Sequence, residues 1–357
     1  MKRKKIITSL LIIFGLSLSS PSLATTNVYP LSIILNHHPK FRSLQAKNVE
    51  IVRKKFVREK KQLSASKQIK MKNLNSKLDF NFFNFESFSP SSGFNFPSFN
   101  STFSYNNNGY ASGVLGEELK GNKYAIIIGI SNYPGTTIDL KYADDDAYIV
   151  KEILESQYNF PSENIFSFID EGTGANNSQP TQATAQNIFN KINELKEKLG
   201  PEDELIFFFS GHGARGQAND RDSEFVDEAI VVHDGQNNIY IWDGQLRDWF
   251  SDFPTDRIVF IFDSCLSGGM TDLSAPGRII NMATQEFGFY DSAVELDNLG
   301  HGEFTYYFFI KAIKEKLGDV TPTDGLVSCE EAFDYANNNS IYDKPSIIDY
   351  FENDLYF

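Results

Sequence analysis

The sequence reads LIFFF at residues 205–209 and continues as SGHG at residues 210–213; a second apolar run, IVFIF at residues 258–262, continues as DSC at residues 263–265. Unbroken apolar runs of this length are typical of strands buried on both faces of a parallel sheet. In such sheets, reactive side chains gather just beyond the carboxyl ends of the strands. A thiol and an imidazole at that edge form a cysteine nucleophile with its base. His212 and Cys265 therefore predict a cysteine peptidase.

From Lys123 onward, short apolar runs alternate with amphipathic segments. We expect strands at residues 124–130, 165–169, 205–209, 229–233, 258–262 and 279–283. We expect helices at residues 143–156, 181–199, 244–250, 304–317 and 329–337. This alternation predicts an α/β domain at residues 119–357, with a mainly parallel central sheet and helices on both faces.

The amino terminus has the features of an export signal. Four basic residues at positions 2–5 precede the apolar run Ile6 to Leu18, and small residues lead up to Ala24. We therefore expect a signal peptide at residues 1–24 and an exported protein, periplasmic or secreted. The alternative is a membrane anchor, which requires about 20 apolar residues, more than this run offers. We expect no membrane span once the signal is cleaved.

The chain after the expected signal peptide has a basic part followed by an acidic part. Residues 40–78 contain 13 Lys and Arg against 2 Asp and Glu, whereas residues 79–357 contain 16 against 45. The acidic part argues against nucleic acid as a partner and favours Ca²⁺ or basic peptides. Residues 25–118 have no sustained core pattern, and residues 79–113 are rich in Phe, Asn and Ser, so we expect a disordered prosegment. The alternative is that the phenylalanine-rich part docks over the active-site groove.

The only two cysteines are Cys265 and Cys329. In an exported protein they could form a disulfide, but the position of Cys265 at a strand end favours a free thiol. Cys329, at the start of an expected helix, is the size and polarity of a core residue.

Glycines flank His212 on both sides, and Gly268-Gly269 follow Cys265. They let the loops turn tightly and let a substrate backbone approach, and the N–H groups of the Cys265 loop together with that of Gly213 can form an oxyanion hole.

The region from about Lys123 to Asp349 resembles the caspase-like cysteine peptidases, specifically the metacaspases and their bacterial relatives. Five motifs carry the resemblance: YAIIIGISNY at 124–133, LKYADDDA at 140–147, FSGHG at 209–213, DSCLSG at 263–268 and GHGEFT at 300–305. The resemblance implies a caspase-like three-layer sandwich with His212 and Cys265 as the catalytic dyad. The animal caspase Gln-Ala-Cys signature is absent, which points away from cleavage after aspartate.

The resemblance also implies substrate specificity. Metacaspases cleave after Arg or Lys, and the positions matching their acidic pocket are Asp263 and Asp146. Two carboxylates at the base of a pocket favour a basic side chain. The alternative roles are a strand-end turn for Asp263 and helix capping for Asp146.

Many metacaspases bind Ca²⁺, and motif matching places Asp227, Asp243 and Asp272 at the ligand positions. Carboxylate oxygens suit this hard cation, although Gly244 stands where an acidic residue is usual. The alternative is that these aspartates cap helices or face water. We expect no organic cofactor and no zinc site, and we interpret His301 in the second Gly-His-Gly as structural.

These features predict an endopeptidase that cuts after Arg or Lys through a thioester acyl-enzyme, with peptides or proteins as substrates. The chain's own prosegment is a further expected substrate, at Arg53-Lys54-Lys55 or Lys60-Lys61. The alternatives are a catalytically silent caspase-fold interaction module and a peptidase with a different preference at P1, the residue before the cut.

Overall fold

The computed structural model describes residues 46–57, 111–135, 137–170, 183–220, 224–286, 291–320 and 323–357. The expected signal peptide and most of residues 25–118 lie outside these ranges. Among the described residues, no helix has the length and apolar character needed to cross a membrane.

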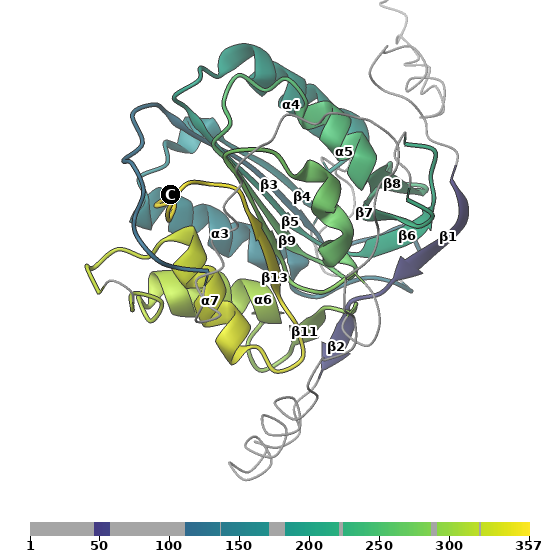
Figure 1. Ribbon diagram of the computed structural model, residues 1–357. Helices are drawn as coiled ribbons and strands as arrows, with labels where there is room; N and C mark the ends of the chain where they lie inside the picture. Colours follow the sequence, from purple (N-terminus) through teal and green to yellow (C-terminus); the bar gives the residue numbers. More distant parts are fainter. Residues whose placement is uncertain are drawn as a thin grey trace, which may run out of the picture. The chain divides into compact units, whose positions relative to one another are not determined.

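A six-stranded sheet forms the centre of the domain, in the order β13-β10-β9-β5-β3-β4 (Figure 1). The strands span Lys123–Ile130 (β3), Ile165–Asp170 (β4), Glu204–Ser210 (β5), Ile258–Asp263 (β9), Arg278–Met282 (β10) and Ser346–Asp349 (β13). All neighbouring strands are parallel except β13, which pairs antiparallel with β10. The expected mainly parallel sheet is confirmed.

Helices cover both faces of this sheet, as Figure 1 shows. One face carries α3 (Ala143–Gln157), α6 (Glu303–Thr305), a π-helical segment η4 (Tyr306–Lys314) and α7 (Cys329–Asn339); the other carries α4 (Ala185–Lys198) and α5 (Asp243–Phe250). The side chains of β5 alternate accordingly. Phe208 packs against Phe309 on one face, whereas Phe207 packs edge-on against Phe250 on the other. Apolar burial on both faces is why these strands read as continuous hydrophobic runs.

The single helix expected at residues 304–317 is divided into α6 and η4. Two 3₁₀ segments, η1 (Ser162–Asn164) and η2 (Ser267–Leu273), complete the helical elements of the described chain.

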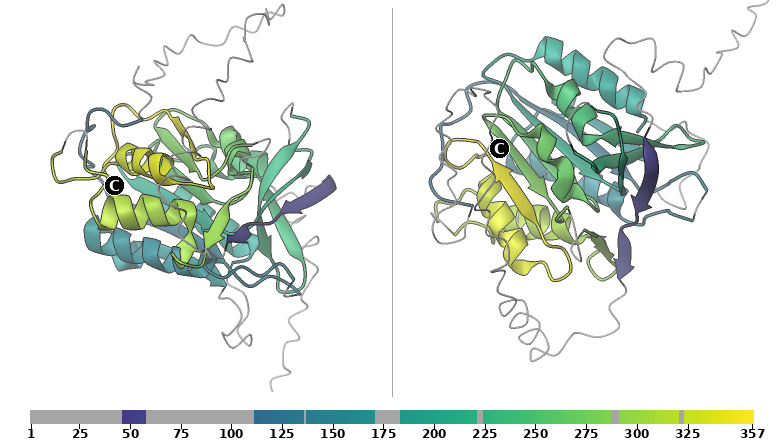
Figure 2. Two further views of the ribbon diagram at one scale, coloured as in Figure 1. Left: turned by 90° about the horizontal axis from the view of Figure 1, so that it is seen from below. Right: turned by 45° about the vertical axis from the view of Figure 1, so that its right-hand side comes forward.

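Two smaller sheets flank the carboxyl edge of the central sheet. The first has the order β1-β6-β7-β8, with β1 at Lys47–Val52, β6 at Gly213–Gln217, β7 at Asp227–His233 and β8 at Asn238–Trp242. The second has the order β12-β11-β2, with β12 at His301–Gly302, β11 at Val294–Leu296 and β2 at Lys55–Val57. Figure 2 shows β1 and β2 lying along the domain.

The strands β1 and β2 fall in the segment 25–118, which was expected to lack order. That expectation is wrong for residues 47–52 and 55–57. The reason is tertiary: β1 adds to the open edge of β6 through backbone pairing, and β2 pairs with β11. Composition does not report such pairing, because a short strand with a basic surface resembles a solvated arm.

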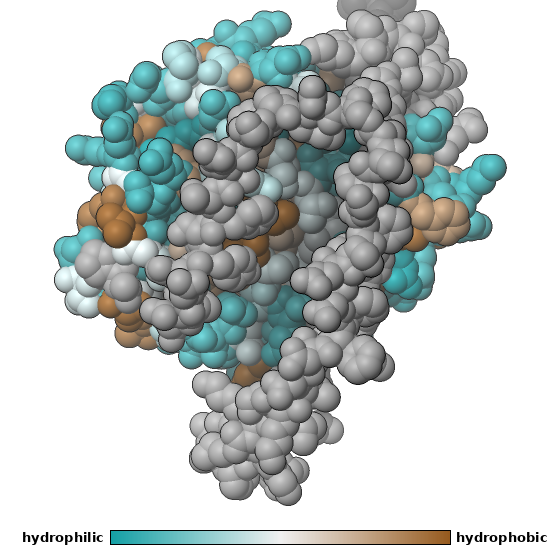
Figure 3. Space-filling view, in the orientation of Figure 1, coloured by the Kyte–Doolittle hydropathy of each residue, from teal (hydrophilic) through white to brown (hydrophobic). Residues whose placement is uncertain are grey.

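On the face drawn in Figure 3, hydrophilic residues predominate over the visible described surface, with separate hydrophobic patches. The exposed large hydrophobic residues among the described ones are Phe56, Val114, Tyr148, Phe225, Leu317 and Val320.

Candidate active site

Strand register places His212 and Cys265 together. Ser210 at the end of β5 lies opposite Asp263 at the end of β9, and His212 and Cys265 each follow two residues later. A Cβ atom added to Gly213 would lie 1.9 Å from the carbonyl oxygen of Cys265, so only glycine fits here. The two loops are therefore in direct contact, as the sequence predicts.

The imidazole of His212 is held by its surroundings. Its Nε2 lies 2.6 Å from the carbonyl oxygen of Ile138, and its main-chain N–H donates to the hydroxyl of Tyr133 at 2.9 Å. The Tyr133 ring lies against the imidazole, 4.7 Å between centroids. Because a carbonyl can only accept, Nε2 carries the proton and Nδ1 is the hydrogen-bond acceptor. Burial lowers the pKa of His212 to about 4, so the ring is neutral at pH 7.

The thiol of Cys265 is fully buried and accepts a hydrogen bond from the Ala293 N–H, with 3.2 Å from N to Sγ. Burial raises the pKa of this thiol to about 12, which keeps it protonated at neutral pH. Both cysteines are free, and Cys329 accepts from the Asn281 amide instead, so the alternative of a disulfide is excluded.

Leu266, the residue after Cys265, has a left-handed backbone conformation with φ of 59°. Non-glycine residues seldom adopt this conformation, and such strain is concentrated at functional sites.

Asp146 and Asp263 form a fully buried acidic pocket beside this pair, and it contains the side chain of Lys54. The Lys54 ammonium lies 2.6 Å from Asp263 Oδ1 and 3.8 Å from Asp146 Oδ2. Its Nζ also donates to the Ser210 hydroxyl at 3.2 Å. All three charged side chains have no exposed area. The two carboxylates that the resemblance assigned to substrate specificity are thus occupied by a lysine of the same chain.

Neighbouring groups fix the two carboxylates. Asp146 accepts from the Ser210 hydroxyl at 2.8 Å and from the Gly302 N–H at 3.1 Å. Asp263 Oδ2 accepts from both the main-chain N–H and the hydroxyl of Thr305, at 2.9 and 2.6 Å. His301, interpreted from sequence as structural, places Nδ1 3.1 Å from Asp146. The pocket is therefore rigid before any substrate binds.

Burial alone would lower the pKa of Lys54, but the carboxylates of Asp263 and Asp146 raise it above its ordinary value. The ammonium is consequently charged at any physiological pH. Removing one partner of a buried ion pair typically costs about 3–5 kcal/mol, because the remaining charge is left without compensation. Lys54 is therefore a strong anchor for the segment that carries it.

The backbone on both sides of Lys54 is also held. Lys54 N–H donates to Nδ1 of His212 at 3.2 Å, and Val52 pairs with Gly213 in the sheet. On the other side, Lys55 N–H donates to the Ala293 carbonyl at 2.9 Å. Ala293 thus contacts Lys55 through its carbonyl oxygen and Cys265 through its N–H. The Lys54–Lys55 peptide bond lies across the candidate dyad.

A separate acidic cluster combines two of the predicted metal ligands with a third residue. Carboxylate oxygens of Asp220, Asp227 and Asp243 lie within 4.8 Å of one another. A Cβ atom on Gly244 would lie 2.6 Å from Asp220, so the glycine at this position makes room for a carboxylate from elsewhere in the chain. Asp272, the third predicted ligand, instead accepts a hydrogen bond from Arg247.

The cluster fits a hard cation. Both carboxylate oxygens of Asp243 are buried without a hydrogen-bond partner, and so are those of Glu228. Burial and neighbouring carboxylates raise the pKa of Asp243 to about 9 and that of Glu228 to about 8. A bound divalent cation would stabilise the charged forms of these groups.

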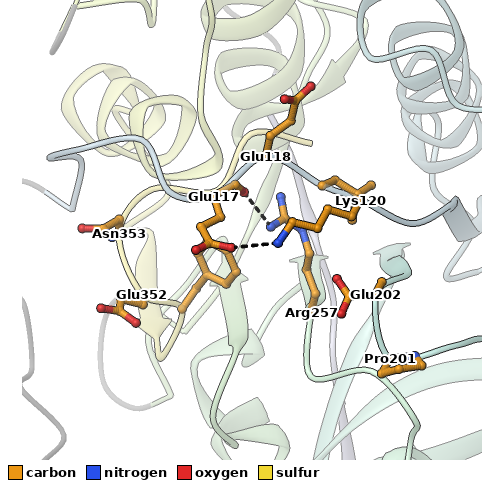
Figure 4. Close-up of a pocket in the computed structure, with 10 residues that line it drawn as sticks. Glu117, Glu118, Lys120, Pro201, Glu202, Arg257, Glu352 and Asn353 are labelled. Carbon is orange, nitrogen blue, oxygen red and sulfur yellow. Dashed lines mark hydrogen bonds and ion pairs between the residues drawn. The ribbon is translucent and has the colours of Figure 1, made fainter.

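A pocket of about 340 Å³ lies at the opposite end of the parallel sheet, where β5 and β9 begin (Figure 4). Its lining combines acidic side chains with Lys120 and Arg257. Figure 4 shows the hydrogen bonds that these two donate, Lys120 to the Glu117 carboxylate and Arg257 to the Glu117 main-chain carbonyl. Ligands of parallel sheets bind at the carboxyl ends of strands, so this pocket is not the expected site of chemistry.

Several site residues were not predicted from sequence: Lys54 as an occupant, Ser210, Thr305, Ala293, Ile138 and Asp220. A weak signal for Lys54 exists. The basic triplet at residues 53–55 is flanked by the apolar–polar alternation NVEIV at residues 48–52 and by Phe56-Val57, a strand-like pattern within the basic arm.

Residues 123–274 match the family model described as Metacaspase, peptidase C14 domain. Over 153 residues the chain is 35% identical to Metacaspase-4 of Arabidopsis thaliana, and over 163 residues it is 34% identical to Metacaspase-1 of Lodderomyces elongisporus. These alignments cover 42% and 43% of this chain and 34% of each relative. The chain therefore spans about a third of the length of the curated relatives it matches.

The fold of residues 123–274 is caspase-like, and these residues are similar to the peptidase C14 domain of the metacaspases. The resemblance and fold expected from the sequence are confirmed.

Cysteine reactivity tests the arrangement around Lys54. In the full chain, we expect Cys265 to react slowly with iodoacetamide at pH 7, because it is buried and its pKa is raised to about 12. The Lys54→Gln substitution should release the segment and accelerate labelling, since each unit by which the thiol pKa falls raises the thiolate fraction about tenfold. Peptide mass spectrometry measures labelling at each cysteine, with buried Cys329 as the internal control. Equal rates at Cys265 in both proteins would contradict the arrangement.

Proposed function

We propose that the chain is a cysteine endopeptidase that cleaves after Lys or Arg, with His212 and Cys265 as its catalytic dyad. The observation that carries the proposal is Lys54, whose ammonium fills the pocket of Asp146 and Asp263 while its peptide bond to Lys55 crosses the dyad. A peptidase with this pocket selects a cation, and Arg gains further from bidentate pairing. The same pocket disfavours the neutral or acidic side chains of the alternative specificities.

The chemistry follows from the geometry. His212 Nδ1 takes the thiol proton, and the Cys265 thiolate attacks the carbonyl carbon of the P1 residue. The imidazolium then gives its proton to the leaving amine, which leaves a thioester that water hydrolyses. The Gly213 N–H and the loop N–H groups after Cys265 are the proposed donors to the oxyanion. Ile138 and Tyr133 hold the ring in the tautomer that this sequence of steps requires.

The structure suggests how the chain is kept inactive before this chemistry begins. The Lys54 N–H occupies the lone pair of His212 Nδ1, the atom that must accept the thiol proton. Both members of the dyad are neutral, and the thiol is buried. We propose that residues 46–57 form an inhibitory segment, and that a small shift of Lys54 converts it into the first substrate. The cut would fall between Lys54 and Lys55; the other expected target, Lys60-Lys61, lies outside the described residues.

Calcium is the proposed activator. The cluster of Asp220, Asp227 and Asp243 adjoins Glu228 on β7, and β7 pairs with β6, the strand that holds β1. A Cβ atom on Gly269, in the 3₁₀ segment after Cys265, would lie 2.1 Å from Glu228. A cation at this cluster would therefore be separated from β1 by one strand, β6. It would be connected to the loop after Cys265 through Glu228.

We propose export through residues 1–24 as the route by which the peptidase reaches peptide or protein substrates outside the cytoplasm.

Self-cleavage is the first test. Full-length protein incubated with Ca²⁺ should lose the segment before Lys55, which intact-mass spectrometry detects. Cys265→Ala should stay whole because it has no nucleophile, and Lys54→Gln should not be cut at this bond because the pocket requires a cation. Lys54→Arg should still be cut, and Lys47→Gln is the matched control on exposed β1. Cutting of Cys265→Ala at the same bond would refute the assignment of the nucleophile.

Specificity is the second test. Fluorogenic peptides with Arg or Lys at P1 should be hydrolysed, and those with Asp or Asn should not. Asp146→Asn removes one carboxylate while keeping its shape, and the loss of a charge-assisted pair should reduce kcat/KM for Arg peptides by about tenfold or more. Asp145→Asn, the neighbour outside the pocket, should leave kcat/KM unchanged. Preferential cleavage after Asp would overturn the proposal.

Metal binding is the third test. In the metal-free protein, Asp243 holds an extra proton relative to the unfolded chain between its usual pKa of 3.8 and about 9. Stability of the metal-free fold should therefore fall as pH rises through that interval. Because Ca²⁺ binds the deprotonated form, its stabilising effect should be larger at pH 8 than at pH 6.

Differential scanning fluorimetry of the Cys265→Ala protein measures this effect without self-cleavage. Asp243→Asn should abolish the increase in Tm caused by Ca²⁺, whereas Asp248→Asn, on the same helix, should retain it. An unchanged Tm of the Cys265→Ala protein at millimolar Ca²⁺ would contradict the assignment of the cluster.

A further inference from the structure

The residues that follow the Lys54–Lys55 bond are also held by strand pairing and hydrogen bonds. Lys55, Phe56 and Val57 form β2, which pairs in parallel with β11. Lys55 N–H donates to the Ala293 carbonyl at 2.9 Å, and Asp297 N–H donates to the Val57 carbonyl at 3.2 Å. If the chain cuts itself after Lys54, these residues occupy the positions P1′, P2′ and P3′ of the substrate.

Phe56 makes the most specific side-chain contacts of the three. Its ring lies under the Lys141 ammonium, with 4.1 Å from Nζ to the ring centroid, and beside the ring of Tyr142, 6.4 Å between centroids. An ammonium over an aromatic face is attracted by the negative potential of that face. The contacts suit an aromatic ring better than an aliphatic chain of similar size.

Lys141 and Tyr142 are held in place independently of Phe56. Their main-chain N–H groups donate to the carboxylate of Glu295 at 3.1 and 2.8 Å. Glu295 is buried on β11, directly opposite Phe56 in the strand register. The Tyr142 hydroxyl donates to Asp297 at 2.9 Å. The surface that receives Phe56 is thus formed by β11 and the turn that it supports.

Apart from Lys54 itself, side chains before the bond make exposed polar contacts, such as that of Arg53 with the Thr137 carbonyl at 3.4 Å. Glu50 and Arg215 form an ion pair at 2.9 Å, but 61% of the glutamate side chain and 36% of the arginine side chain are exposed. Exposed pairs of this kind contribute little. Selectivity beyond P1 is therefore expected after the cut rather than far before it.

We propose that the peptidase has a primed-side subsite for an aromatic residue at P2′, formed by Lys141 and Tyr142 and positioned by Glu295. The inference rests on the proposed peptidase function, and it adds the class of substrate: basic at P1 and aromatic two residues after the cut. Strand addition to β11 supplies affinity that does not depend on sequence, and the subsite supplies the selectivity.

The test uses internally quenched peptides of one sequence with Lys at P1 and Phe, Leu, Ala or Glu at P2′. They are assayed with the full chain after its own cut is complete. Any retained Lys55–Val57 segment competes equally with all four peptides, so the ratios of kcat/KM are unaffected. We expect Phe to exceed Leu by about threefold to fivefold, the range of an exposed cation–π contact, and Glu to be poorest because of Glu295 and Asp297.

Lys141→Met keeps the aliphatic stem but removes the charge, and it should reduce the ratio of Phe to Leu toward one. Lys151→Met, on the exposed surface of α3, should leave the ratio unchanged. An Arg-P1 peptide with a dye as leaving group has no P2′ residue and reports basal activity, which Lys151→Met should leave unchanged. Equal cleavage of the Phe and Leu peptides, or a preference that survives Lys141→Met, would overturn the subsite.

The same assay separates two kinds of failure. If the dye peptide is cut but the P2′ series shows no preference, the subsite is wrong and the peptidase assignment stands. If neither the dye peptide nor any of the four quenched peptides is cut, the peptidase assignment itself fails.

Discussion

One buried interaction organises the active-site edge of this protein: the Lys54 ammonium between the carboxylates of Asp146 and Asp263. Two buried carboxylates in proximity are costly without a cation. The lysine supplies that cation, and in doing so it brings its own peptide bond across the candidate dyad. The pairing of β1 with β6 and of β2 with β11 then holds the chain on both sides of that bond.

In the proposed function, the same interaction accounts for both substrate recognition and inhibition. The pocket that holds Lys54 would then take the basic P1 side chain of another protein. As long as Lys54 remains, however, the His212 lone pair is occupied and the Cys265 thiol is buried and protonated. We propose that this substrate-like segment protects the enzyme from premature activity. In the proposed function, the acidic cluster next to β7 links Ca²⁺ binding to this segment, because β7 pairs with β6 and β6 pairs with β1.

The central fold could be predicted from sequence because strands buried on both faces appear as unbroken runs of apolar residues. The strands β3, β5 and β9 and the helices α3 and α7 match the expected ranges within a few residues. His212 and Cys265 could be placed together because parallel strands of similar length end at one edge. Asp146 and Asp263 were found through family motifs rather than through physical pattern.

Other features could not be predicted because they depend on contacts between distant segments. The edge strand β1 is defined by its partner β6, and its basic surroundings conceal it. Asp220 reaches the acidic cluster only because Gly244 leaves room for it, a relation with no local signal. The hydrogen bond between Ile138 and His212 involves a main-chain carbonyl, which every residue has.

The ionisation of Lys54 tests this account most directly. Heteronuclear NMR of the Cys265→Ala chain, with Lys54 assigned through the Lys54→Arg variant, would follow its side-chain resonances through an alkaline titration. We expect Lys54 to stay protonated well above pH 10.5, the ordinary lysine pKa. Titration of Lys54 near pH 10.5 would show that its ammonium is in water, and it would contradict a buried ion pair at this position.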